Sequence, residues 1–204
     1  GDPREVEATT ARAKLLFNPA GLRDLTTKLT FNHFGSTAPQ NESLNPQPHP
    51  TNPRHDPRRA VFKSNMNSTI WDLAWEAYDA LTLENRVIYT DFNINRPTAY
   101  NIQYAEIDGQ EVHVEPVVRF GGADSRLHGL AGLRYFHGTQ DEFVNIFGGS
   151  TFKDKTDTHS AFAELTYALT PQVDVTAASR LEREHRRRDG GSQAVRIDFD
   201  ETYT

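Results

Sequence analysis

Apolar and polar positions alternate through most of this chain, most regularly in residues 157–191. One face of the first strand in this segment carries Ala161, Ala163, Leu165 and Tyr167. A tight turn leads into a second strand with the same period of two. One apolar and one mostly polar face over this length indicate strands of a transmembrane β-barrel, because one face meets lipid and the other a wet lumen.

The same periodicity marks further strands along the chain. The predicted strands are residues 6–17, 25–34, 68–78, 81–95, 110–120, 126–137, two strands within 157–191, and the start of another at 196–204. The sequence therefore predicts an all-β fold, an antiparallel up-and-down meander of about eight or nine strands that belong to a larger transmembrane β-barrel.

The predicted connections alternate between short and long. A proline-rich polar loop is expected within residues 35–67, and two further long loops at 97–108 and 138–156. Proline lacks a backbone N–H group, so the first of these segments cannot be a central strand. All short turns would lie at one end of the sheet and all long loops at the other, which is typical of outer-membrane barrels.

Three alternatives remain open at this level. Residues 68–86 also fit helical spacing, because Ile70, Leu73 and Ala77 follow an i, i+3, i+7 pattern. A soluble antiparallel β-sandwich that binds carbohydrate or another surface ligand would show the same alternation of apolar and polar residues. A small, complete barrel of eight strands would have no exposed edges.

Composition narrows the function classes. Hydrophobic residues make up 36% of the 204 residues and charged residues 25%, which suits strands that show only every second side chain to lipid. No run of about 18 apolar residues is present, so the sequence predicts no transmembrane helix. The net charge of −6 argues against general binding of nucleic acid, and the lack of cysteine excludes disulfides and thiolate metal sites.

Several segments, in order, resemble a known family. ARAKLLFNP followed by LTTKLTFNHF resembles a pair of strands early in the barrel of TonB-dependent outer-membrane receptors. RLHGLAGLRYFHGTQDE is similar to a recurring strand of that family, and THSAFAELTYALTPQVDVTAASRLEREHR to its aromatic strand, leucine–threonine turn and strand ending in arginine and glutamate. FDETYT resembles the loop that follows.

The resemblance implies a partial receptor barrel over residues 1–204, without the plug domain or the C-terminal closing strands, from a barrel of about 22 strands. It implies TonB-dependent uptake of a ferric siderophore or similar nutrient in the outer membrane of a Gram-negative bacterium. The implied partners are outer-membrane lipid, the TonB energy transducer acting through the plug domain, and a siderophore-type small molecule. No nucleic acid, no cofactor other than a transported iron chelate, and no enzymatic activity are expected.

Candidate binding residues lie on predicted lumen-facing positions. They are Glu111, His113, Glu115, Arg119 and Arg180. Lumen side chains of a barrel tune its selectivity, so these residues are candidates for contact with the ligand or the plug. A generic wet lumen wall would look the same. No catalytic residues are predicted, because no G-x-S-x-G elbow is present.

No metal site is predicted, since the histidines do not show helical metal-ligand spacing. His49, His55 and Asp56 could contact a metal in the proline-rich loop, where a flexible polar loop is the simpler interpretation. The run Glu182–Arg188 predicts a cationic patch at the outer end of its strand, for an anionic iron chelate or lipopolysaccharide phosphate.

Aromatic side chains are candidates for the girdles that flank a lipid-facing band. They are Trp71, Trp75, Phe120, Tyr135 and Tyr167.

Overall fold

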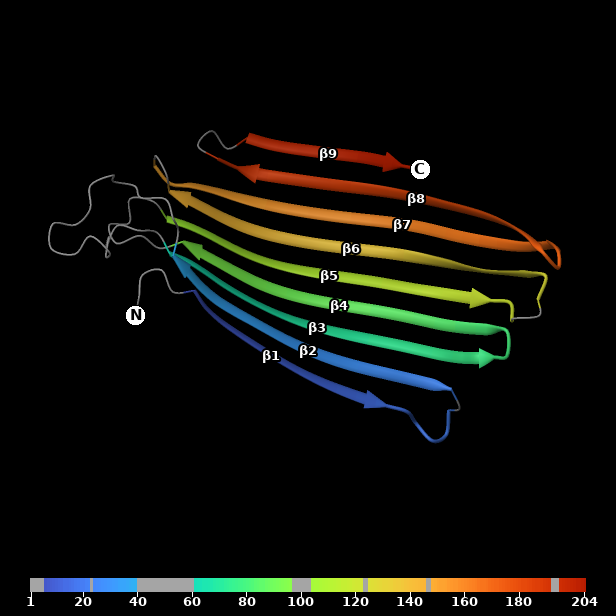
Figure 1. Cartoon of the computed structure of the whole chain (residues 1–204). Coiled ribbons are helices and arrows are strands. Elements are labelled where there is room, and N and C mark those ends of the chain that lie inside the picture. Colours follow the sequence, from blue (N-terminus) through green and yellow to red (C-terminus); the bar gives the residue numbers. More distant parts are fainter. Residues whose placement is uncertain are drawn as a thin grey trace.

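The computed structural model describes residues 6–22, 24–39, 61–96, 104–122, 125–145, 148–191 and 195–204. These residues form nine strands: β1 Glu7–Phe17, β2 Leu25–Pro39, β3 Val61–Tyr78, β4 Leu81–Arg96, β5 Tyr104–Phe120, β6 Leu127–Asn145, β7 Ser150–Thr170, β8 Val173–Gly190 and β9 Val195–Tyr203. All nine belong to one sheet in sequence order, and each pairs antiparallel with the next (Figure 1). The predicted all-β meander is confirmed. The helical alternative for residues 68–86 is wrong, since they lie in β3 and β4.

The strands are longer than predicted. Strand β5 starts at Tyr104, inside the predicted loop 97–108. Strands β6 and β7 leave only residues 146–149 between them, so the predicted loop 138–156 is wrong, and with it the strict alternation of short and long connections. These added segments are mostly polar on both faces, so they show little of the period of two that marks a strand in the sequence. The loop predicted within 35–67 is bounded by β2 and β3, and residues 40–60 lie outside the described part of the chain.

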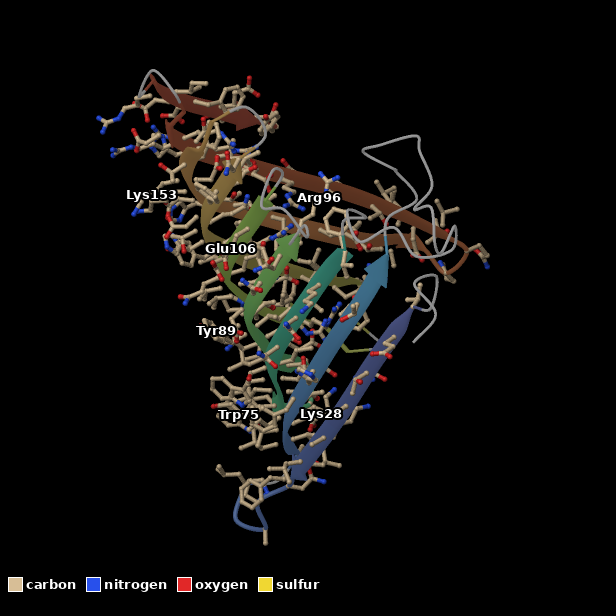
Figure 2. All side chains as sticks on the ribbon, turned by 90° about the vertical axis from the view of Figure 1, so that its left-hand side faces the viewer. Lys28, Trp75, Tyr89, Arg96, Glu106 and Lys153 are labelled. Atoms are coloured by element: carbon tan, nitrogen blue, oxygen red, sulfur yellow. The ribbon has the colours of Figure 1, made fainter. Side chains whose placement is uncertain are left out.

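The sheet is curved, so its two faces differ in shape. Figure 2 shows Trp75, Tyr89 and Lys153 on the convex side of the curve, and Lys28 and Arg96 on the concave side. Residues that face each other in the register of neighbouring strands share a face of the sheet. The register therefore assigns every other described strand residue to one side.

A band of apolar side chains covers the convex face near the β1–β2, β3–β4, β5–β6 and β7–β8 turns. One register row across six strands consists of Leu15, Leu29, Trp71, Val87, Val114 and Tyr135. Toward the opposite strand ends, the same face becomes polar, with Asn67, Asp91 and Gln110 in one row. The convex face thus has an apolar zone and a polar zone along each strand.

The edge at which the apolar band meets the polar zone, called its upper edge, is inclined to the register rows. On β4 the edge is Tyr89, whose row leads through Val112, His137 and Asp157 to His185 on β8. On β8, however, the last apolar residue of the convex face is Leu181, four residues before His185. These four residues span roughly 13 Å along the strand, and the four spacings from β4 to β8 span roughly 19 Å across the sheet. This corresponds to a strand tilt of roughly 35°, which lies within the range of membrane barrels.

The sheet is a single layer without a core of its own. Among the described residues, Val117 is the only buried hydrophobic side chain, at 9% exposure, whereas Leu15, Trp71, Leu133 and many other large apolar side chains are exposed. The described residues contain no second sheet, and β1 does not pair with β9. A sandwich and a closed eight-stranded barrel are therefore both absent from the described chain. No described segment is a helix of the length and apolarity that crossing a membrane requires.

Candidate functional site

The five residues predicted to face the lumen all lie on the concave face. Glu111, His113, Glu115 and Arg119 are alternate residues of β5, and Arg180 faces Phe162 across the β7–β8 pair. The structure brings His113 and Glu115 together, with 3.5 Å between Nε2 and Oε2. Arg180 lies three strands away and pairs instead with Glu182.

A row of alternating charges crosses the concave face from β2 to β5. Lys28, Asp72, Arg86 and Glu115 are direct register partners from strand to strand. The Asp72 carboxylate lies 2.8 Å from Lys28 Nζ and 2.6 Å from Arg86 Nε. Opposite charges on directly facing positions stabilise a sheet, and here they hold the side chains of four strands in one line. The sequence analysis did not predict this row, because its members are far apart along the chain.

Beside the charge row the concave wall is hollowed. A cavity of about 530 Å³ is lined by Lys28, Asp72, Arg86 and Glu115, together with Glu84 and Arg119 from the next two rows toward the turns. Arg119 Nε donates to both Glu84 carboxylate oxygens at 3.1 Å. The cavity thus presents cations and anions side by side, which suits a polar ligand or polypeptide rather than an apolar one.

A second charged cluster lies at the far end of the concave face, around Arg188. Arg188 donates to Glu142 at 2.6 Å and to Asp154, and its guanidinium lies 4.4 Å from the ring centre of Phe152. Arg186 lies 3.8 Å from the other Asp154 oxygen, and the Asp154 side chain is only 8% exposed. Glu142 and Asp154 were not predicted, because both lie within residues 138–156, which the sequence assigned to a loop.

The predicted cationic patch at Glu182–Arg188 is split between the two faces. Arg186 and Arg188 lie on the concave face, whereas Arg183 and Arg187 lie on the convex face. Each arginine has an acidic partner: Arg183 donates to Asp200 at 2.7 Å, for example. An extended strand sends successive side chains to opposite sides, so a run of charges in sequence does not make a patch in space.

The outer end of the β8–β9 pair is held by an ion-paired triad. Asp189 accepts hydrogen bonds from Arg196 and Arg187, each at 2.6 Å. These hydrogen bonds, that of Arg196 foremost, lower the pKa of Asp189. Because the pKa of the folded state is depressed, the stabilisation is present above the unfolded pKa and is lost as pH falls through the folded value.

We therefore expect pairing of the outer end of β9 to weaken only below about pH 4, the usual range of an aspartate. Hydrogen exchange of residues 195–198, corrected for the intrinsic rate at each pH, should report it. Asp189→Asn should remove this pH dependence. A transition between pH 5 and 8 would contradict the assignment to Asp189.

The aromatic residues predicted for girdles lie on the convex face. Trp75 and Phe120 lie close to the turn end of the sheet, and Tyr135 lies near the upper edge of the apolar band. Tyr89, which was not predicted, lies at the same upper edge. Tyrosine and tryptophan favour the interface between hydrocarbon and water, so this placement fits two boundaries of one band.

A metal centre is not evident in the described part of the chain, where no three metal-ligating side chains converge. His137 Nδ1 lies 2.6 Å from Asp157 Oδ1, but this is a cross-strand pair on the convex face. His49, His55 and Asp56 lie outside the described residues.

Comparisons with solved structures identify the architecture, whereas no protein family model matches the sequence. The chain is similar to the ferric yersiniabactin uptake receptor FyuA from Yersinia pestis, with a TM-score of 0.70 and 12% identity over 97% of this chain and 33% of that one. The alcaligin outer membrane receptor FauA from Bordetella pertussis gives a TM-score of 0.73 and 10% identity over 97% and 31%. The ferric citrate transporter FecA gives 0.76 and 10% over 97% and 32%.

This chain thus spans about a third of the length of the receptors that it matches. The fold implied by the resemblance to TonB-dependent receptors is confirmed over nearly the whole chain. The chain has the fold of a section of the barrel wall of outer-membrane siderophore and ferric citrate receptors.

Proposed function

We propose that this chain forms part of the wall of a TonB-dependent receptor in the outer membrane of a Gram-negative bacterium, and that the receptor imports a ferric siderophore or a similar iron chelate. The observation that carries the proposal is the contrast between the two faces of one curved layer. The convex face exposes an apolar band, and the concave face carries ion-paired rows. Exposed apolar side chains of this extent are unfavourable in water and favourable in lipid.

The likeness to siderophore and ferric citrate receptors supports the transport role. In this proposal the chain supplies wall and lumen surface without a catalytic centre or resident cofactor, and the iron chelate is cargo. Outer-membrane lipid covers the convex face, and the TonB energy transducer acts through a plug domain. Glu111, His113, Glu115, Arg119 and Arg180 contribute to the lumen path of the ligand.

The test is iron uptake by cells that lack the gene for this protein. We expect loss of uptake for one class of ⁵⁵Fe-labelled chelate among hydroxamate, catecholate and citrate complexes, with the other classes unchanged. Uptake should return with the wild-type gene and should fail in a strain without a functional energy transducer. Unchanged uptake of every chelate, with the protein present in the outer-membrane fraction, would contradict iron import while leaving the barrel intact.

A lumen variant refines the same assay. Neutralising Glu111, Glu115 and Arg119 together should reduce the uptake rate at an unchanged amount of protein in the outer membrane, if these residues contact the ligand or the plug. An unchanged rate would make them generic wall residues.

A further inference from the structure

A groove interrupts the apolar band on the convex face of β5–β8. Its volume is about 540 Å³. Its apolar lining consists of Val114, Pro116, Leu133, Ala161 and Leu181. This groove is distinct from the charged cavity of the concave wall, because the register places the residues of its apolar lining on the opposite face.

Two features of the sequence explain the hollow. Pro116 has no N–H group to donate, and the ladder between β5 and β6 is interrupted between the pairs Val114–Tyr135 and Val117–Gly132. In the same band, Ala161 lies between Leu133 on β6 and Leu181 on β8. A methyl side chain between two leucines leaves a trough, with the leucines as its walls.

Polar side chains gather at the end of the groove that faces the polar zone. They are Tyr135, His159, Arg183 and Thr202, which form one register row from β6 to β9. The rings of Tyr135 and His159 lie 5.0 Å apart between centroids. A hydrocarbon-lined trough therefore ends at a hydroxyl, an imidazole and a guanidinium.

Arg183 is the charged member of this row. Its side chain is 67% exposed, and Asp200 accepts from Nε at 3.1 Å and from Nη2 at 2.7 Å. A guanidinium has five N–H donors, so this pair orients the group and leaves further donors for an anion. Arg183 lines the groove on this face, whereas Lys155 and Arg187 lie further toward the polar zone and pair with Asp157 and Asp189.

We propose that the groove is a binding site for a phosphorylated membrane lipid, with an acyl chain along Pro116, Leu133 and Ala161 and the phosphate against Arg183. A lipid is the occupant because the trough opens within the band that faces hydrocarbon, and because Arg183 at its polar end keeps N–H donors available for the oxygens of a phosphate headgroup. Arginine binds phosphate in a planar, forked geometry. This inference rests on the proposed membrane location of the convex face.

Native mass spectrometry of the intact protein in detergent would test the site with three probes: dipalmitoyl phosphatidic acid, dipalmitoylglycerol and inorganic phosphate. We expect phosphatidic acid to bind about tenfold more tightly than dipalmitoylglycerol, because only the former offers charge-assisted hydrogen bonds. Inorganic phosphate alone should not bind. Arg183→Gln should reduce the affinity for phosphatidic acid to the affinity for dipalmitoylglycerol.

Ala161→Trp should fill the trough and abolish the preference for phosphatidic acid over dipalmitoylglycerol. Ala163→Trp, two residues away on the same face, should retain this preference. If Ala161→Trp does not fold, Ala161→Leu is the substitute. Equal binding of the two lipids, binding of phosphate alone, or equal behaviour of the Ala161 and Ala163 variants would overturn the proposal. Each variant is first checked for the heat-modifiable gel migration of a folded barrel. A wild-type protein that never reaches this form would contradict the barrel assignment. A folded barrel without a lipid preference would overturn only the proposed lipid site.

Discussion

Val87→Arg is expected to lower the free energy of unfolding in a bilayer by about 1–3 kcal/mol, because the cost of an arginine on the lipid face of a barrel falls from about 2–4 kcal/mol at the midplane to about 0–1 kcal/mol near the interface. Val87 lies on the convex face between Trp71 and Val114, one convex position inside Tyr89 at the edge of the apolar band. Its new charge would have to remain in hydrocarbon or distort the bilayer. Urea titration of the protein folded in lipid vesicles would measure the loss.

The matched control is Ile88→Arg, one residue further along the same strand. Ile88 faces Ile70 and His113 on the concave side, so its arginine would enter the polar lumen. We expect a loss well below that of Val87→Arg. Equal losses for the two variants would mean that both faces meet the same environment, and the barrel assignment would fail.

Arg188→Ala is expected to lower the free energy of unfolding by about 3 kcal/mol, because removing one partner of a buried ion pair leaves the other charge uncompensated. Asp154, whose side chain is 8% exposed, would keep only Arg186 at 3.8 Å, and Glu142 would lose its 2.6 Å hydrogen bond. The stacking of the guanidinium on Phe152 would also be lost. The expected loss of unfolding free energy is at the low end of the range for buried ion pairs, since the Arg188 side chain is 32% exposed.

Two controls separate charge from general disruption. Arg187→Ala, on the opposite face, removes a solvent-accessible pair with Asp189 and should cost much less than Arg188→Ala. Adding Asp154→Asn to Arg188→Ala should recover part of the loss, because it removes the uncompensated charge. The same urea titration measures all three. No recovery in the double variant would show that packing, rather than charge, sets the cost.

The alternation of apolar and polar residues was enough to predict the strand class, the order of the strands and the face to which each side chain points within its strand. These features follow from a period of two, which is a local property of an extended backbone. The five lumen candidates all lie on the concave face for the same reason. The resemblance to a receptor family added the expectation of an open section of a large barrel, and the fold agrees with it.

Other features depended on how the strands align with one another. The charge row through Lys28, Asp72, Arg86 and Glu115 exists only because four strands pair in one register. A shift of one residue in any of them would move its charge to the other face. The cluster around Arg188 likewise joins β6, β7 and β8, two of whose contributing segments carried no alternation to reveal them.

The extent of the strands and the curvature of the sheet were also decided only in three dimensions. Beyond the apolar band both faces of a strand are mostly polar, so the alternation of apolar and polar residues fades before the strand ends. The inclination of the band, the groove at Ala161 and the separation of Arg183 from Arg188 all follow from register and tilt. Local sequence specifies which way a side chain points, whereas only the pairing of distant strands specifies what it meets.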